Sequence, residues 1–303
     1  MIKFHIPEEK KVRVILDSDV KNEVDDQFAI VHAVLSESME LKGIIPAHFG
    51  EEKSVHSQQD SYEEAMLILK KMNKENKVRV ESGAKCALRD ENTPVESDGA
   101  RLIIEEAMKE DERPLYIAFL GPLTDMASAL LMEPEIAKKN ITVIWIGGRD
   151  YPCGGWEYNL KNDVCAANVV FRSQAALWQV PRNVYRMMPV SFAELWDRVH
   201  PYGEIGQYLA ENVVSFNNEW KSRPAEYRIL GDSPSIGIIL FPDCGEWEWR
   251  PAPEFDEQMR YVCTGKGRPV RVYKNIDSRF ILEDFYAKLK FFAAGSGHDR
   301  AEC

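Results

Sequence analysis

The stretch VRVILDSDVKNEVDDQFAIVHAVL, residues 12–35, contains in succession the features that decide the fold. Residues 12–16 form a short apolar run typical of a buried strand. A dense set of acids follows at once, and the apolar residues after it recur with helical spacing. A strand, an acidic loop and a helix in this order predict the first unit of an open α/β sheet. The acids are Asp17, Asp19, Glu23, Asp25 and Asp26.

The acidic loop is predicted to be a site because of its place after a strand. In open α/β sheets, ligands bind in the crevice outside the carboxyl ends of the strands. Carboxylates gathered in a crevice repel one another and lose hydration, and a bound cation relieves both effects. Oxygen ligands without neighbouring Cys or His favour Ca²⁺ or Mg²⁺ over zinc. The structural alternative is a solvated acidic loop that caps the following helix.

Two of these acids, Asp25 and Asp26, fall in the first turn of the predicted helix. Negative charge there complements the helix dipole. Adjacent residues on a helix point about 100° apart, so the two carboxylates can take different roles. One could hold a metal while its neighbour binds a substrate hydroxyl.

Strand and helix patterns alternate through the first half of the chain, which predicts right-handed βαβ crossovers. We predict a single large α/β domain over residues 1–294, with a mostly parallel central sheet flanked by helices, and a disordered tail over 295–303. Residues 236–240 suit either a helix or a buried strand. The other expected strands are 41–47, 78–80, 115–120, 141–146, 247–250 and 270–273, and the expected helices are 62–72, 100–108, 123–132, 164–171, 201–220 and 281–292.

Composition narrows the class of protein. With 303 residues, 45% of them hydrophobic, the chain can bury one large core. A formal charge of −11 without a basic cluster argues against a nucleic-acid partner. No segment suits a signal peptide or a membrane span, so we expect a cytoplasmic protein with no membrane partner. The six cysteines include no Cys-x-x-Cys pair, which favours reduced thiols over zinc ligands or disulfides.

Three further segments place polar groups at predicted turns. GPLT at 121–124 follows a strand, and a carbonyl at a strand end is a Ca²⁺ ligand type. GG at 147–148 and EYN at 157–159 let a ligand approach the backbone and offer hydrogen-bonding groups. GDSP at 231–234 opens an apolar stretch, where Asp232 is also an N-cap candidate. Each segment alone suits an ordinary turn, loop or cap.

Together the segments resemble the inosine-uridine preferring nucleoside hydrolase family. The family's Asp-x-Asp and Asp-Asp motifs match residues 17–26, and its Gly-Pro-Leu-Thr and Gly-Gly strand ends match 121–124 and 147–148. Its Glu-Phe-Asn motif appears as 157–159, followed by an Asp and an Ala-Ala pair, and a last Asp motif matches 231–234. The matches keep the family's order and span residues 12–240.

The resemblance implies a role for each matching residue. It implies that Asp19, Asp26 and Asp232 bind Ca²⁺ through their side chains and Leu120 through its backbone carbonyl. It also implies that Asp25 binds ribose hydroxyls. Asp19 would additionally be the base that takes a proton from water. The remaining implied roles are sugar binding by Glu157 and Asn159, and orientation of the ligands by Asp17.

The leaving-group side departs from the family pattern. Gly231 stands where many members have a His thought to assist the departing base. Candidate replacements that would contact the base are His48, Trp156 and Tyr227. A lone His is also commonly a structural hydrogen-bonding residue, and the two aromatic residues also suit walls of a base pocket.

We therefore predict Ca²⁺-dependent hydrolysis of the N-glycosidic bond of a ribonucleoside, giving ribose and a free base, as in purine or pyrimidine salvage. Family likeness suggests a homodimer or homotetramer. One alternative is a non-catalytic paralogue that binds ribose or a nucleoside with its metal. Another is a haloacid dehalogenase-type phosphatase, since ILDSDV at 15–20 resembles that family's opening, with Mg²⁺ and Asp17 as nucleophile.

Overall fold

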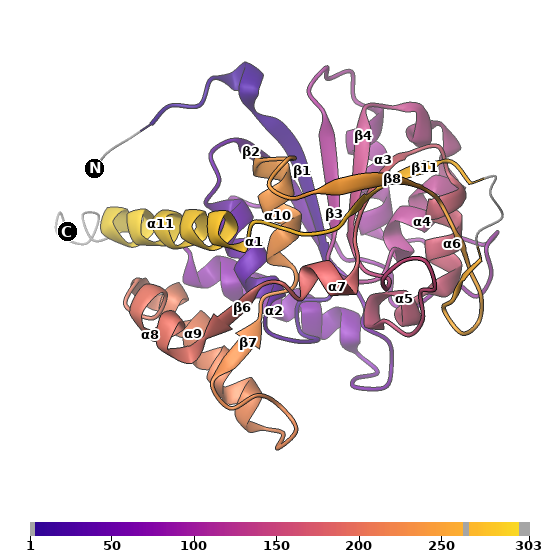
Figure 1. The fold of residues 1–303 in the computed structure, drawn as a ribbon. Helices are drawn as coiled ribbons and strands as arrows, with labels where there is room; N and C mark the ends of the chain where they lie inside the picture. The colour runs from indigo at the N-terminus through magenta and orange to yellow at the C-terminus, as the bar shows by residue number, and fades with distance from the viewer. Residues whose placement is uncertain (1–3, 263–266, 297–303) are drawn as a thin grey trace.

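A seven-stranded sheet forms the centre of the molecule in a computed structural model that describes residues 4–262 and 267–296 (Figure 1). All neighbouring strands are parallel except the last pair, where one edge strand runs antiparallel to its neighbour. The prediction of a mostly parallel sheet in one α/β domain is confirmed. The spatial order is β2 (Met39–Pro46), β1 (Val12–Ser18), β3 (Leu115–Phe119), β4 (Ile141–Ile146), β5 (Ala176–Val180), β11 (Pro269–Tyr273) and β8 (Trp247–Pro251).

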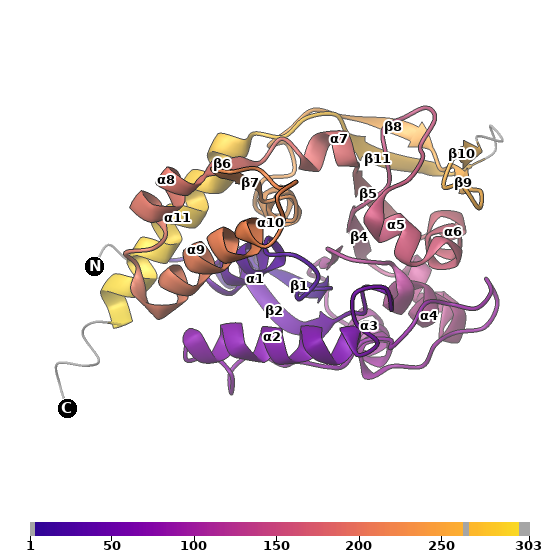
Figure 2. The same ribbon diagram turned by 90° about the horizontal axis from the view of Figure 1, so that it is seen from below.

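Helices cover both faces of the sheet because the strand residues alternate between two apolar faces. In β1, Val14 and Leu16 pack in one buried cluster and Ile15 in the other. Figure 2 shows the helices on the two sides of the sheet. The first cluster contains residues of α1 (Asp26–Val34), α2 (Ser57–Lys71), α9 (Gly203–Asn218), α10 (Ser233–Leu240) and α11 (Ser278–Ser296), and the second contains residues of α3 (Asp98–Met108), α4 (Thr124–Met132) and α6 (Val164–Arg172).

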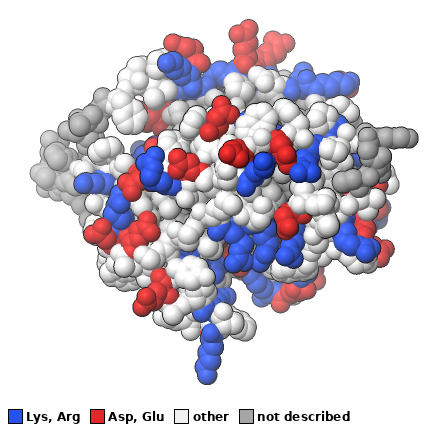
Figure 3. Space-filling model, in the orientation of Figure 1, with Lys and Arg blue, Asp and Glu red and all other residues white. Residues whose placement is uncertain are grey.

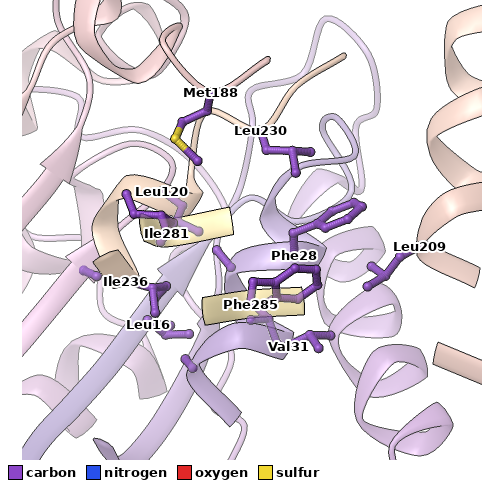
Figure 4. Close-up of a cluster of buried hydrophobic side chains, with 14 of the residues drawn as sticks. Leu16, Phe28, Val31, Leu120, Met188, Leu209, Leu230, Ile236, Ile281 and Phe285 are labelled. Carbon is purple, nitrogen blue, oxygen red and sulfur yellow. The ribbon is translucent and has the colours of Figure 1, made fainter. Parts of the chain in front are cut away.

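The first cluster supports the helices that carry the acids. Phe28 of α1 meets Phe285 of α11 with ring centroids 5.6 Å apart, and Ile236 of α10 joins the same cluster (Figure 4). Burying each such side chain stabilises the fold by about 1.5–3 kcal/mol. The starts of α1 and α10 are thereby held against the carboxyl end of β1.

The order of the strands creates a crevice at one place. The chain passes from β1 to β2 on one side and then returns to β3, β4 and β5 on the other side. Ligand sites in open α/β sheets lie at such a reversal, outside the carboxyl ends of the strands. Here the two strand ends that flank the reversal carry Asp19 and Leu120.

Three expectations need correction or completion. Only Val80 of the strand expected at 78–80 pairs, in a single bridge to Ile44, since the chain meets the edge of β2 only there. The ambiguous residues 236–240 belong to α10, buried between the sheet and α11. Helix α11 continues through Gly295 to Ser296, past the start of the expected tail, and the remaining tail residues lie outside the described residues.

Several shorter elements complete the fold. No helix within the described ranges combines the length and apolarity needed to cross a membrane. The remaining elements are η1 (Glu8–Lys10), η2 (Pro134–Lys138), α5 (Tyr158–Asn162), α7 (Arg182–Tyr185), α8 (Phe192–Arg198), the paired strands β6 (Pro189–Ser191) and β7 (Tyr227–Ile229), and the paired strands β9 (Glu254–Phe255) and β10 (Tyr261–Val262).

Candidate active site

A cavity at the strand reversal, called here the inner chamber, collects all but one of the acids that the sequence singled out, the exception being Asp17. No Lys or Arg of the described chain lines it. The predicted site residues Asn159 and Leu120 also line it, together with Tyr158, Tyr185 and Gly231. The acidic residues of the lining are Asp19, Glu23, Asp25, Asp26, Glu157 and Asp232.

The ends of β1 and β3 place Asp19 and Leu120 in this chamber. Asp19 follows β1 by one residue, and its Oδ2 accepts a hydrogen bond from Asn22 Nδ2 at 3.0 Å. It also approaches the backbone after β3 closely, since a Cβ on Gly121 would lie 3.0 Å from its Cγ. The glycine in the GPLT segment therefore makes room for the carboxylate.

Two helix starts bring three further carboxylates together. Asp25 and Asp26 lie at the start of α1 and Asp232 precedes α10, and one oxygen of each lies within 4.8 Å of the others. Neither Asp25 nor Asp232 uses its carboxylate to cap its own helix. Capping therefore does not account for Asp232. Instead, Ser18 Oγ donates to Asp26 at 2.6 Å and the Gly231 N–H donates to Asp25 at 2.9 Å.

The electrostatics of the cluster favour a bound cation. Burial, followed by the neighbouring carboxylates, raises the pKa of Asp19 and of Asp232 well above the ordinary range. Burial and the nearby Glu23 raise the pKa of Asp25 to about 8. Burial raises the pKa of Asp26 to about 6, although the hydrogen bond from Ser18 opposes the shift. A bound cation would keep all four carboxylates ionised at neutral pH, because its charge offsets their burial and mutual repulsion.

These residues therefore fit a hard divalent cation. Carboxylate oxygens are ligands that Ca²⁺ and Mg²⁺ prefer, and Asp25, Asp26 and Asp232 already converge. Leu120 lines the same chamber, and its backbone carbonyl accepts a hydrogen bond from Asn159 Nδ2 at 2.7 Å. A carbonyl oxygen has two lone pairs, so this bond leaves one available.

Glu157 and Asn159 are held rigidly at the other wall. Glu157 caps α5, and its Oε2 accepts hydrogen bonds from the N–H groups of Leu160 and Gly148 at 3.0 and 2.9 Å. Its Oε1 accepts from Tyr185 Oη at 3.0 Å. The EYN segment is thus a buried part of the chamber, and the surface-loop alternative does not hold for it.

Asp17 points away from the chamber. Its carboxyl is fully buried and receives no hydrogen bond from an N–H or hydroxyl group of the described residues, and it lies within hydrogen-bonding reach of the Asp125 carboxylate. Burial, then the charge of Asp125, raises the pKa of Asp17 well above its usual range. Asp125 itself accepts hydrogen bonds from the Ala84 N–H and from Ser97. A nucleophilic Asp17, as in the phosphatase alternative, would have to face the crevice, so that alternative is not supported.

The structure separates the three candidate base-side residues. Trp156 and Tyr227 line a second, larger cavity next to the inner chamber, called here the outer chamber, and both are about half exposed. His48 lines neither chamber. It is 1% exposed, and its Nε2 lies 2.9 Å from the hydroxyl of Thr124, which donates to Asp163 at 2.8 Å.

The outer chamber also contains residues that sequence reasoning missed. Arg182, Arg186 and Tyr185 come from the four-residue helix α7 and its following turn, and Arg228 comes from β7. Helix α7 is too short to show an apolar period, so no periodic signal identified it. The sequence signal that could have identified this wall of the outer chamber is the pair Arg182 and Arg186, four residues apart in a chain with more acidic than basic residues.

If ribose release, the activity predicted from the sequence, is measured, we expect that replacing Gly231 with Ala will lower its kcat/KM by about ten-fold. An added Cβ would lie 3.0 Å from Tyr185 Cδ2 and 3.3 Å from an Asp25 oxygen, so both side chains would shift. The measurement is steady-state kinetics, with thermal unfolding to check the fold. In a Tyr185→Leu background the same Ala should have less effect, and an equal loss in both backgrounds would refute the contact with Tyr185.

We expect that His48→Ala will lower the free energy of unfolding by about 2–4 kcal/mol. The substitution opens a buried cavity and removes the partner of Thr124. Burial also lowers the pKa of His48 to about 4, so the ring is neutral at pH 7. Chemical denaturation is the measurement, and His56→Ala, at an exposed His, is the control. A destabilisation no larger than the control's would contradict a structural role.

Comparison with known proteins agrees with this geometry. A family model described as inosine-uridine preferring nucleoside hydrolase matches residues 14–275. The chain belongs to this family. Uridine nucleosidase 1 of Arabidopsis thaliana is 25% identical over 262 residues, which cover 77% of this chain and 75% of that protein. The pyrimidine-specific ribonucleoside hydrolase RihA of Salmonella gallinarum is 27% identical, over 92% of this chain and 99% of its own length.

Other matches are partial or show the fold alone. The chain spans 45% of the length of probable uridine nucleosidase 2 of Oryza sativa subsp. japonica, at 24% identity. A purine-preferring ribonucleoside hydrolase from Gardnerella vaginalis superposes with a TM-score of 0.76 at 20% identity, over 93% of this chain and 99% of that one. A plant nucleoside hydrolase superposes with a TM-score of 0.75 at 17% identity, over 92% and 99%. These superpositions confirm the nucleoside hydrolase fold, and the family model confirms the N-glycosidase class.

Proposed function

We propose that this nucleoside hydrolase family member hydrolyses the N-glycosidic bond of a ribonucleoside with the help of Ca²⁺, giving ribose and a free base. The observation that carries the proposal is the inner chamber itself. It gathers carboxylates whose pKa values are raised by burial and mutual repulsion, and no basic residue of the described chain lines it. A site of this kind suits a small substrate that has hydroxyl groups and develops positive charge.

Each residue has a role that suits its surroundings. Asp19, Asp26 and Asp232, with the carbonyl of Leu120, would hold the cation. When bound, Ca²⁺ would orient the ribose hydroxyls and lower the pKa of a water molecule. Asp25 would accept hydrogen bonds from ribose hydroxyls at the edge of the chamber. Glu157 and Asn159 would contact the remaining sugar oxygens from the opposite wall.

The reaction then follows from the charges. Asp19 accepts a proton from water while the water oxygen forms a bond to C1′ of the ribose. The C–N bond breaks, and its electron pair goes to the nitrogen of the departing base. The sugar is oxocarbenium-like in between, so the surrounding carboxylates stabilise it. Tyr158 and Tyr185 line both chambers and would separate the sugar from the base.

The base side offers aromatic rings in place of an imidazole. No His of the described chain lines either chamber. Trp156 and Tyr227 would stack on the base, and the substrate is expected to be one that departs without a histidine acid. Cytoplasmic location and assembly as a homodimer or homotetramer stay predictions.

The test is ribose release from a panel of purine and pyrimidine nucleosides, with Ca²⁺ present and after chelation. Release that stops on chelation and returns with added Ca²⁺, more fully than with Mg²⁺, would support the proposal. If no nucleoside is cleaved but calorimetry detects Ca²⁺-dependent nucleoside binding, the non-catalytic alternative replaces it. Chelation-resistant release would instead contradict the role of the cation.

A further inference from the structure

The outer chamber carries charge of the opposite sign to that of the inner chamber. It is a cavity of about 330 Å³, large enough for a heterocycle, and it shares the rim residues Asp25, Tyr158, Tyr185 and Gly231 with the inner chamber. Arg182, Arg186 and Arg228 contribute to its lining. Figure 3 shows Lys and Arg side chains gathered near the centre of this face, next to the position of α7 in Figure 1.

One of the three arginines is already neutralised. Arg228 pairs with Glu23, which also lines the chamber, and its guanidinium lies 4.9 Å from the centre of the Phe216 ring. The other acid of the lining, Asp25, accepts a hydrogen bond from the Gly231 N–H at the inner rim. Neither acid pairs with an arginine of α7 or its turn.

Arg182 and Arg186 differ from every other arginine in residues 4–262 and 267–296. The others each have an ion pair or a side-chain hydrogen bond, whereas these two have neither, and no ring contact replaces it. This occurs in a chain with 49 acidic and 38 basic residues, where acidic partners are plentiful. Two unpaired guanidinium groups on one wall of a substrate cavity are typical of a site that binds an anion.

Resting on the proposed function, we propose that the outer chamber binds an anionic group of the substrate, a carboxylate or phosphate, through Arg182 and Arg186. A substrate with such a group would be repelled by the inner carboxylates and by the overall charge of −11 unless local positive charge opposed them. The planar guanidinium matches the two oxygens of a carboxylate or phosphate. The aromatic lining holds the heterocycle between the sugar and this anion.

The anion can belong to either end of the substrate. A carboxylate on the base would reach the arginines across Trp156 and Tyr227, which line the same cavity. A phosphate on the sugar would reach them past Tyr185, which bonds Glu157 in the inner chamber. Both have the same chemistry, so the substrates in the test must separate them.

The test compares kcat/KM for uridine, for orotidine, which adds a carboxylate to the same base, and for uridine 5′-monophosphate. We expect the wild type to prefer one of the two anionic substrates over uridine by about ten-fold or more. Arg182→Gln combined with Arg186→Gln should remove about ten-fold of that preference and change kcat/KM for uridine by less than about two-fold. The preference should also shrink with added salt.

Arg101→Gln is the matched control, because Arg101 is exposed on α3, lines neither chamber and carries the same charge. Uridine cleavage without preference for either anionic substrate, or a preference that survives the double substitution, would overturn the inference and leave the proposed function standing. If no compound is cleaved at its N-glycosidic bond, the proposed function fails first. In that case, calorimetric binding of orotate and ribose 5-phosphate tests the anion site by itself. If the inference is right, the double variant binds one of the two about ten-fold more weakly than the wild type does.

Discussion

The substitution Asp26→Asn is expected to lower kcat for ribose release by about 10²–10³-fold without unfolding the protein. The new side chain has nearly the same shape, and its oxygen can still accept the hydrogen bond from Ser18. It has lost the negative charge that faces Asp25 and Asp232. Cation affinity and stabilisation of the positively charged sugar should therefore both fall, while repulsion inside the chamber is relieved.

Steady-state kinetics and thermal unfolding, each with and without Ca²⁺, measure these effects. Ca²⁺ should raise the melting temperature of the wild type, because ligands that bind only the folded state stabilise it. It should do so much less in the variant. Asp98→Asn is the matched control, since Asp98 is likewise the first residue of a helix but is exposed on α3. Activity within ten-fold of wild type in Asp26→Asn would exclude this carboxylate from the site.

The metal-free protein is expected to lose stability as the pH rises from 6.5 to 8. Burial and the nearby Glu23 raise the pKa of Asp25 to about 8, while in the unfolded chain this group has an ordinary pKa near 4. The folded state therefore holds a proton that unfolding releases, and its stabilising effect disappears as the pH approaches 8. Asp19 and Asp232, whose pKa values are also raised, act in the same direction.

Denaturant titrations at several pH values after chelation measure how the free energy of unfolding changes with pH. This slope should be about −1.4 kcal/mol per pH unit for each proton released on unfolding. Burial lowers the pKa values of His32 and His48, so both rings take up protons on unfolding near pH 6.5, and this opposing contribution fades as the pH rises towards 8. Saturating Ca²⁺ should abolish or reverse the slope, because the cation binds the ionised carboxylates. A metal-free protein whose stability is flat or rises over this range would show that the cluster is ionised without a cation.

The sequence alone determined the architecture and the acidic half of the site. The run at 12–16 followed by paired acids predicted a strand end facing a crevice, and β1 and the inner chamber have that arrangement. Alternating patterns predicted the parallel sheet because burial on two faces requires apolar runs between turns. The ordered motifs led to the family that the comparison then confirmed.

The sequence did not determine the direction of individual side chains. Asp17 and Asp19 are two residues apart, yet Asp17 lies buried beside Asp125 and Asp19 faces the chamber. His48 seemed available for the base and instead bonds Thr124 below the site. Asp17 is still in β1, whereas Asp19 and His48 lie just past the ends of strands, where side-chain direction depends on which distant elements pack nearby. Local pattern does not record those contacts.

Only the tertiary structure brought the lining of the outer chamber together. Trp156, Arg182 and Tyr227 come from segments far apart in the chain and meet in the outer chamber. The short helix α7 places Arg182, and the short strand β7, paired with β6, places Tyr227. Such elements have little intrinsic preference of their own. The acids lie at the end of one strand and at the starts of two helices, so their position could be predicted from the sequence. The arginines depend on long-range packing, which is the physical reason that the opposite charge of the outer chamber appeared only in the folded protein.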